Sequence, residues 1–258
     1  NYTMQANASL TGHNATSNQS MVNQGYVFLT YCNDSANNLG AANVNFSVEQ
    51  TNIWMCNKIN QHNTLYTQNQ SIVPTGLASS QFCINISAQN VTYNGNGYSI
   101  SNFTSNFQAI RSESSNSTIN NVIIRKNDTT SGYSGIQLFN SNRSTIFNAS
   151  INKSYYGVFV TSSDNIKIWL STISNSWDYP IYLSNSDYFN ISNNTIYNTT
   201  TAGSGHGHGI YSSISADHGY IVGNNFFEIV SSSIYLYGFN NNTIIKNNLS
   251  SNGRSSSE

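Results

Sequence analysis

Two aspartates and a histidine are the residues of this chain that are best suited to acid–base chemistry. His208 stands in the glycine-rich run from Gly205 to Gly209, and Asp187 and Asp164 precede it by one and two repeat lengths. General acid–base catalysis needs one group that donates a proton and another that accepts one, and Asp and His side chains can take either part. The three residues are therefore catalytic candidates, provided that the fold brings them to one face.

A structural role explains the same aspartates without catalysis. Asp164, Asp187 and Asp217 each stand four residues before an isoleucine that opens a repeat, and Ser115 and Asn142 fill the equivalent position elsewhere. Ser, Asn and Asp are selected at a corner where the side chain bonds the main chain of a turn. We therefore expect these carboxylates to make turns, with a cation site on stacked carboxylates as the alternative.

Histidine and cysteine spacing gives weak support for a metal centre. His206 and His208 would need Asp217, His218 or Glu228 to complete a coordination shell. No Cys-x-x-Cys or His-Cys spacing, which zinc sites commonly use, occurs in the chain. We therefore assign no metal site and no cofactor.

The three cysteines are an odd number, so at most two of them can pair within one chain. In an exported protein we favour a bridge between Cys56 and Cys83, which would fasten the preceding segment onto the first repeat. A bridge between Cys32 and Cys56 is the alternative. Closing a loop of this length could stabilise the fold by about 3 kcal/mol. The third thiol has no assigned role.

A row of tyrosines is the main candidate for binding a ligand. Tyr182, Tyr211 and Tyr235 alternate with inward apolar residues in successive repeats, so their rings should point outward. An exposed tyrosine row can stack on sugar rings, and it can equally be packed together or covered by a partner or by glycan.

An apolar ladder defines the elements that must position these residues. Its first members are isoleucines that recur every 22 to 30 residues: Ile119, Ile146, Ile168, Ile191, Ile221 and Ile244. A second apolar residue follows each of them five places on: Ile124, Ile151, Ile173, Ile196, Phe226 and Leu249. Repeats of this length, with short alternating strands and no helical period, predict an all-β parallel solenoid whose coils bury their apolar faces against one another.

The chain divides into two parts by its repeats. Residues 1–55 lack the repeat and contain two candidate strands, 25–31 and 44–48, which we interpret as a β-rich cap, a small β-domain or an assembly arm. Residues 56–258 form the predicted solenoid, whose last repeat, 243–249, is cut short. Because an uncapped solenoid end exposes unpaired strand edges, we expect copies of the chain to associate end to end.

Composition and charge exclude some partners. Only 7% of the residues are charged and the net charge is −1. Binding to nucleic acid needs a basic surface, and the one basic pair, Arg125 with Lys126, is typical of a solvated turn. No run of 18 apolar residues is present, so we expect no direct membrane span, and the start at Asn1 suggests a trimmed terminus.

Acceptor sequences for N-glycosylation are abundant. Asn-x-Ser/Thr begins at 20 positions, against about 11 for the same composition in random order. The positions are Asn1, Asn7, Asn14, Asn18, Asn33, Asn45, Asn69, Asn85, Asn90, Asn102, Asn116, Asn127, Asn142, Asn148, Asn152, Asn190, Asn193, Asn198, Asn241 and Asn248. We expect covalent N-glycans at many of them and an extracellular or cell-surface location.

Two stretches carry a resemblance to a known superfamily. Residues 83–86, Cys-Ile-Asn-Ile, and 90–100, Asn-Val-Thr-Tyr-Asn-Gly-Asn-Gly-Tyr-Ser-Ile, resemble an opening coil of the pectate-lyase-like and NosD-type right-handed parallel β-helix proteins. Asn-Asn-Thr-Ile at 241–244 is another typical coil opening, and the resemblance runs from about Cys56 to the end. The cysteine spacing is also similar to that of archaeal-type surface glycoproteins. The resemblance implies the fold, whereas the function varies widely within it.

Within this superfamily the histidine run resembles polygalacturonases, in which Gly-His-Gly follows an Asp pair and an Asn-Thr-Asp. The resemblance implies catalytic roles for Asp164, Asp187 and His208. The chain departs from the pattern, because Tyr188 replaces the second Asp, Ser-Asp-Asn at 163–165 replaces Asn-Thr-Asp, and no Arg-Ile-Lys follows. These losses favour a protein that is not an enzyme. If the protein is an enzyme, we expect a glycoside hydrolase or a polysaccharide lyase.

The sequence leaves three classes of function open. Sparse site chemistry together with many acceptor sites favours a structural glycoprotein, such as a subunit of a filament, sheath or surface layer assembled head to tail. A glycan-binding adhesin is the second hypothesis. A polysaccharide-degrading β-helix enzyme is the third.

Overall fold

The computed structural model divides the chain into two compact units, Asn1–Gln50 and Thr51–Glu258. Side chains are described for residues 51–75, 82–102, 107–127, 133–200, 206–238 and 240–253. Before residue 51 only backbone strands are described, and at residue 103 only the backbone. The second unit therefore begins a few residues before the boundary that we expected at residue 56. None of the described residues forms a helix that could span a membrane.

The first unit contains two antiparallel strand pairs. Strands β1 (Ala8–Ser9) and β2 (Gly12–His13) form a short pair. Strands β3 (Gln24–Asn33) and β4 (Leu39–Val48) form a long hairpin, in which Tyr31 lies opposite Ala41. The two stretches that the sequence suggested as separate strands thus pair with each other, while their role as a cap or an assembly arm stays a prediction.

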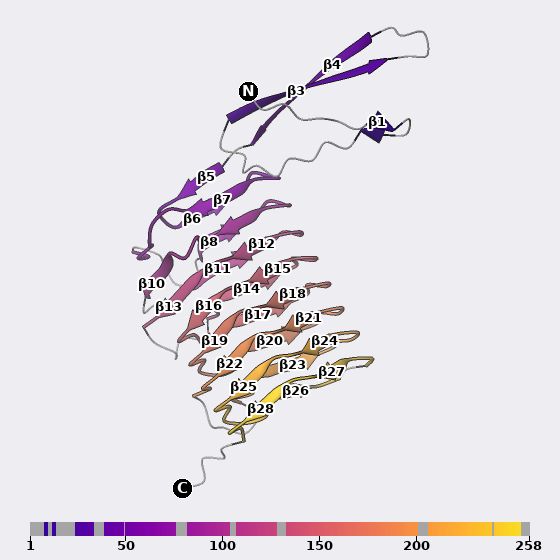
Figure 1. Ribbon diagram of the computed structural model, residues 1–258. Helices are drawn as coiled ribbons and strands as arrows, with labels where there is room; N and C mark the ends of the chain where they lie inside the picture. Colours follow the sequence, from indigo (N-terminus) through magenta and orange to yellow (C-terminus); the bar gives the residue numbers. More distant parts are fainter. Residues whose placement is uncertain are drawn as a thin grey trace. The chain divides into compact units, whose positions relative to one another are not determined.

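The second unit is a stack of coils made of three parallel sheets (Figure 1). Sheet 1 contains β5 (Gln50–Ile53), β7 (Leu65–Gln68), β9 (Thr92–Asn94), β12 (Thr118–Asn120), β15 (Thr145–Phe147), β18 (Lys167–Trp169), β21 (Asn190–Ser192), β24 (Tyr220–Val222) and β27 (Thr243–Ile245). Sheet 2 contains β10 (Ser99–Phe103), β13 (Ile123–Lys126), β16 (Ser150–Asn152), β19 (Thr172–Ser174), β22 (Thr195–Tyr197), β25 (Asn225–Phe227) and β28 (Asn248–Ser250). Sheet 3 contains β6 (Asn57–Ile59), β8 (Phe82–Ile86), β11 (Gln108–Ser112), β14 (Ile136–Phe139), β17 (Val158–Thr161), β20 (Ile181–Ser184), β23 (Ile210–Ile214) and β26 (Ile234–Leu236).

The apolar ladder has the register that the sequence predicts. Ile168 lies between Ile146 and Ile191 in sheet 1, and the pairing continues along the whole first series to Ile244. The second series pairs in the same way in sheet 2, from Ile124 to Leu249. The ladder isoleucines of the inner coils are fully buried, so they form the continuous core that single coils cannot make alone.

Corners between the sheets use left-handed backbone. Most non-glycine residues with positive φ are asparagines, such as Asn121, Asn148 and Asn193 at the corner between sheets 1 and 2. Asparagine tolerates this region because its short polar side chain can bond the local main chain. Leu170 occupies the same corner with a φ of 49° and an exposed side chain, so it turns the chain without that compensation.

A buried asparagine ladder joins the last coils at the same corner. The amide group of Asn194 donates to the carbonyl of Ile168 over 2.9 Å, and Asn224 donates likewise to Ile191 over 2.8 Å. The backbone N–H of Asn194 donates to Asn224 Oδ1, and that of Asn224 donates to Asn247 Oδ1, both over 2.9 Å. The stacked amides at this corner therefore satisfy polar groups that water cannot reach.

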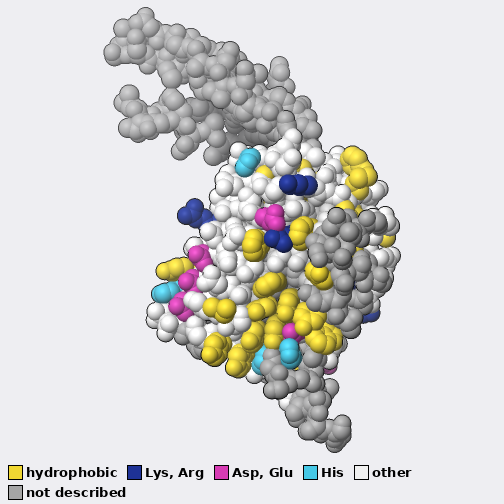
Figure 2. Space-filling view, turned by 180° about the vertical axis from the view of Figure 1, so that it is seen from behind, with side chains coloured by type: hydrophobic (Ala, Val, Ile, Leu, Met, Phe, Trp, Pro, Cys, Tyr) yellow, Lys and Arg dark blue, Asp and Glu magenta, His cyan; other side chains and the backbone are white. Residues whose placement is uncertain are grey.

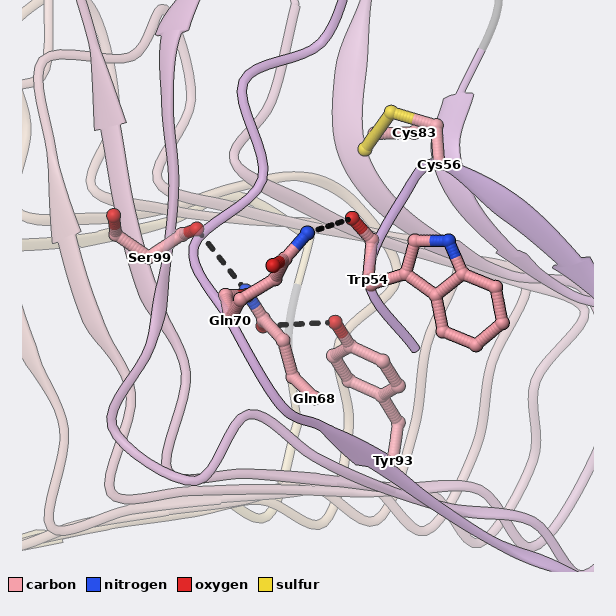
Figure 3. The surroundings of a disulfide bond; sticks show 7 residues. All are labelled: Trp54, Cys56, Gln68, Gln70, Cys83, Tyr93 and Ser99. Atoms are coloured by element: carbon pink, nitrogen blue, oxygen red, sulfur yellow. Dashed lines mark hydrogen bonds between the residues drawn. A yellow bond between two sulfur atoms is a disulfide. The ribbon is translucent and has the colours of Figure 1, made fainter. Parts of the chain in front are cut away.

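A disulfide fastens the start of the solenoid (Figure 3). Cys56 and Cys83 are bonded, which confirms the favoured pairing and excludes the alternative bridge from Cys32 to Cys56. Beside it, Tyr93 donates a hydrogen bond to Gln68 Oε1 over 3.0 Å, and the Gln68 amide donates to the carbonyl of Ser99. These contacts link the first coils covalently and through a buried polar network.

Candidate functional site

The candidate aspartates form a corner column between sheets 3 and 1. The backbone N–H of Asp187 donates to Asp164 Oδ1, and that of Asp217 donates to Asp187 Oδ1, both over 2.9 Å. Below them the N–H of Asp164 donates to Asn142 Oδ1 over 2.7 Å. Each carboxylate is thus engaged by the main chain of the next coil, which is the turn-making role that the sequence favoured.

The third catalytic candidate lies elsewhere on the coils. Asp187 follows β20 at the end of a sheet 3 strand, whereas His208 precedes β23 at the opposite end of such a strand. His208 instead lies against Tyr179, Tyr211 and Tyr235. The structure brings Asp164 and Asp187 together but places His208 with a different set of residues.

Those residues belong to an aromatic surface on the outer side of sheet 3 and its adjoining corner. We call this surface the aromatic face, defined by Tyr155, Tyr156, Phe159, Trp177, Tyr179, Tyr182, His206, His208, Tyr211 and Tyr235. Figure 2 shows hydrophobic side chains gathered on one face of the solenoid, with histidine and acidic side chains beside them. The expected outward row of Tyr182, Tyr211 and Tyr235 is part of it, because these residues pair in register while their strand neighbours Ile181 and Ile210 are buried.

Rings of successive coils stack on one another across the aromatic face. Tyr179 stacks on Tyr211 with centroids 4.2 Å apart, and Phe159 stacks on Tyr182 at 4.8 Å. Tyr235 stacks on His208 and Tyr211 of the preceding coil and remains 42% exposed. Because neighbouring rings cover each other's faces, the inner coils present mainly ring edges and hydroxyl groups, and Tyr235 offers the more open ring.

A buried carboxylate underlies the margin of the aromatic face. Asp178 Oδ1 lies 3.1 Å from His206 Nδ1, and the Asp178 side chain is only 2% exposed while that of His206 is 44% exposed. The N–H of Gly207 points at the same oxygen over 3.4 Å. Burial raises the pKa of the Asp178 carboxyl, although its hydrogen bonds and the nearby His206 partly offset this effect.

His208 is held differently from His206. The backbone N–H of Ser232 donates to His208 Nδ1 over 3.2 Å, and the residue is almost fully buried between tyrosine rings. Burial lowers its pKa, with a smaller contribution in the same direction from His206. His208 is therefore a neutral, packed imidazole that offers little to solvent.

Two other kinds of catalytic centre, a metal site and an open hollow, lack the residues that they would need in the described part of the chain. No group of three or more His, Cys, Asp or Glu in the described part of the chain could hold a metal ion. A hollow of about 350 Å³ lies at the corner between sheets 1 and 2, lined by Asn121, Asn148 and Leu170 among others. Because no ionisable side chain lines that hollow, it offers no acid or base.

Sequence reasoning missed the partnership of Asp178 and His206. Asp178 stands in Ser-Trp-Asp-Tyr-Pro at 176–180, outside the corner position that Asp164 and Asp187 share, so it was not compared with them. The available signal was its separation of 28 residues from His206, which is about one coil. The neighbouring ring pair of Tyr155 with Trp177 is separated by 22 residues, which is also about one coil.

Glycosylation acceptors differ in their accessibility. Ten of those with described side chains are exposed: Asn69, Asn90, Asn102, Asn116, Asn127, Asn142, Asn148, Asn193, Asn241 and Asn248. Four are half-buried: Asn85, Asn152, Asn190 and Asn198. The acceptors at Asn1, Asn7, Asn14, Asn18, Asn33 and Asn45 lie outside the residues with described side chains. Occupancy of all these sites stays a prediction.

Comparison with known proteins places the chain in a family. A family model described as a right handed beta helix region matches residues 108–256, which is more than half of the chain. The chain belongs to this family. Comparison with curated proteins found no match to this chain. The handedness that the resemblance implied is thereby confirmed, whereas the similarity to archaeal-type surface glycoproteins stays a prediction.

Solved structures with the same fold are distant in sequence. The A-module of mannuronan C-5 epimerase AlgE4 from Azotobacter vinelandii is 11% identical with a TM-score of 0.58, and the match covers 76% of this chain and 55% of that chain. The Dettilon tailspike protein is 13% identical with a TM-score of 0.53, covering 77% and 46%. The AlgE6 A-module of the same epimerase group is 14% identical with a TM-score of 0.52, covering 74% and 59%. This chain spans about half the length of these proteins, and such identities show the fold alone.

Proposed function

We propose that this β-helix binds carbohydrate at a cell surface through its aromatic face. The observation that carries the proposal is the partly exposed group of rings on sheet 3, which is bordered by the Asp178–His206 pair. Carbohydrate sites commonly combine aromatic surface with hydrogen-bonding groups, since sugars have apolar C–H faces and many hydroxyls. Tyrosine hydroxyls and an exposed imidazole supply such groups here.

An external location is part of the same proposal. The Cys56–Cys83 disulfide is typical of an oxidising compartment, and the low share of charged residues fits a surface that is hydrated by glycan. One structural neighbour is named for mannuronan, a polysaccharide, and another is named as a tailspike. Those names are compatible with the proposal, and the aromatic face provides its physical support.

Binding measurements with ring deletions test the proposal. Tyr235→Ala and Tyr211→Ala should each weaken glycan binding roughly tenfold, or about 1.4 kcal/mol, because each removes an aromatic contact. Tyr220→Ala is the matched control, since Tyr220 is 55% exposed but lies in β24 of sheet 1, away from the aromatic face. Equal losses in all three variants, or no binding of any glycan on an array, would reject the proposal.

A second candidate function is end-to-end assembly of copies into a filament, sheath or surface layer. Strands β26, β27 and β28 are the outermost members of their sheets, and the ladder residues Ile244 and Leu249 are 45% and 56% exposed there. Exposed ladder residues and unpaired strand edges at this end are suited to pair with the opposite end of a second copy. Such pairing would continue the parallel sheets from one copy into the next.

Electron microscopy and sedimentation separate this candidate from a monomeric binder. Leu249→Asp should abolish end-to-end particles, because it places a charge in the contact, while Asn248→Asp serves as a neighbouring control. Deleting residues 1–50 should also leave a folded solenoid that no longer assembles, if the first unit completes the contact. A chain that stays monomeric at high concentration, or a deletion that forms the same filaments, would argue against assembly.

A further inference from the structure

The Asp178–His206 pair uses one imidazole nitrogen, and the other has no hydrogen-bond partner among the residues that the structure describes. A carboxylate can only accept, so the contact of 3.1 Å requires His206 Nδ1 to carry the proton. Nε2 on the other side of the ring is then an acceptor while the histidine is neutral and a donor once it is protonated. The ring lies nearly parallel to that of Tyr179, with centroids 6.2 Å apart, and the side chain is 44% exposed, so the imidazole stands at the margin of the aromatic face.

Asp178 has one basic partner among the described residues. The ion pairs there are Arg111 with Glu113 and His206 with Asp178. The charge of Asp178 is therefore compensated only when His206 is protonated. Residues 201–205, which precede His206, are Thr-Ala-Gly-Ser-Gly and carry no ionisable side chain.

The negative charge of an ionised Asp178 raises the pKa of tyrosine hydroxyl groups on the aromatic face. The pKa of Tyr155, Tyr156 and Tyr179 is raised mainly by burial, and in each case the charge of Asp178 is the next contribution. The groups that face the pair are thus these tyrosines together with His208, which is kept neutral by burial. None of them supplies a positive charge at neutral pH.

Building on the proposed carbohydrate binding, we propose that the Asp178–His206 pair selects the charge class of the glycan. While the pair carries the negative charge of Asp178, it repels uronates and other anionic sugars, so the aromatic face accepts uncharged glycans. Uptake of one proton by the pair cancels that charge, so acidic glycans become acceptable at lower pH. The pair is therefore a specificity device that responds to pH.

An array of matched polysaccharide pairs tests this inference directly. Each pair has a neutral and a uronate form of one backbone, such as mannan with mannuronan and galactan with polygalacturonate, and binding is measured at about pH 8 and pH 5. We expect only neutral members to bind at the higher pH, and at least a tenfold gain for the uronate members at the lower pH. The neutral members should change much less.

Two variants assign the effect to the pair. Asp178→Asn should admit uronates at both pH values, since the amide keeps an oxygen acceptor for His206 but has no charge. His206→Gln removes the hydrogen bond and the nearby imidazole that lower the pKa of the Asp178 carboxyl, so this carboxyl should take up a proton more readily and uronates should still gain access at the lower pH. Thermal melts establish that each variant is folded, and an NMR titration of the pair in the parent should follow the uronate affinity.

The outcomes separate this inference from the function on which it rests. Uronates that bind as tightly as neutral glycans at the higher pH, or exclusion that persists unchanged in Asp178→Asn, would overturn the charge selection while leaving carbohydrate binding intact. Failure of every glycan to bind would overturn both.

Discussion

Residues in the left-handed backbone region turn the chain at the corners that the structure describes. At the corner between sheets 1 and 2 this residue is Asn148 in one coil, Leu170 in the next and Asn193 in the one after. A branched apolar residue is strained there, because its Cβ approaches the following carbonyl at a cost of about 1–2 kcal/mol. The corner is thus a place where one substitution should improve the protein.

Leu170→Asn should raise the stability of the β-helix by about 1 kcal/mol. The leucine side chain is 47% exposed, so little packing is lost when it is removed. Urea unfolding measures the change, and Leu170→Ala is the control, because it removes the side chain without supplying a residue that favours the left-handed region. A loss of stability in Leu170→Asn would mean that the leucine packing outweighs the strain.

His208 should make the folded state sensitive to acid. Its pKa is lowered by burial from the ordinary value of 6.5, so below that value the unfolded chain binds a proton that the folded chain resists. Stability is therefore full above pH 6.5 and is lost as the pH falls through it. Melting temperatures of the parent and of His208→Gln between pH 8 and 5 test this, and parallel curves for the two proteins would contradict it.

Asp187 should behave as a corner residue and not as a catalytic acid. Asp187→Asn keeps an oxygen for the N–H of Asp217, whereas Asp187→Ala leaves that donor unpaired and should cost about 1–3 kcal/mol. We expect the parent protein to release no reducing ends from pectin-like substrates. Measurable release that disappears in Asp187→Asn would reinstate the catalytic hypothesis for Asp164, Asp187 and His208.

The solenoid is built from strands of three to five residues. Each strand is stabilised by pairing and packing with its neighbours in the coils above and below. Ile168 in β18 has no exposed surface and pairs with Ile146 and Ile191. A buried apolar residue in such a ladder has no route by which a charged replacement could reach water.

Ile168→Asp should therefore unfold or aggregate the protein, since it puts an unpaired charge into a dry stack. Ile168→Val, which removes one methylene group, should cost only about 1 kcal/mol and serves as the control. Circular dichroism and sedimentation report both changes. Were the aspartate variant to melt like the parent, residue 168 would not face inward and the register of sheet 1 would be different.

Sequence periodicity was sufficient for the elements but not for the site. The ladder from Ile119 to Ile244 fixes strand position, register and inward side, because every coil repeats the same packing requirement. The Asp178–His206 pair follows no such repeat, since it lies at a corner of variable length and forms only once. Antiparallel pairing of β3 with β4 also could not be read from the ladder, because those strands lie outside the repeat.

At the scale of the whole molecule, the surface is unusual for its many acceptor asparagines and few charges. Ten acceptors with described side chains are exposed on the coils. If the protein is exported in a host that glycosylates asparagine, glycan would provide the hydration that charged residues provide elsewhere.

Intact-mass measurement of the exported protein should therefore exceed the 28.4 kDa of the bare chain. Treatment with an enzyme that removes N-glycans should restore that mass and reduce solubility, because polar cover is lost. Peptide mapping should find occupied sites at Asn7, Asn14 and Asn18 as well as on the coils. A mass equal to that of the bare polypeptide would refute the glycoprotein hypothesis.

The asparagine ladder has a consequence for the order in which the coils form during synthesis. The N–H of Asn194 finds its acceptor on Asn224, and the N–H of Asn224 finds its acceptor on Asn247, so each corner is completed by residues that are made later. The ribosome makes the chain from its N-terminus. The backbone N–H donors of the most recently made corner therefore have no partner until roughly one further coil has emerged. Growth of the stack therefore lags the emerging chain by one coil, and a translational pause in this region would expose one incomplete corner at a time.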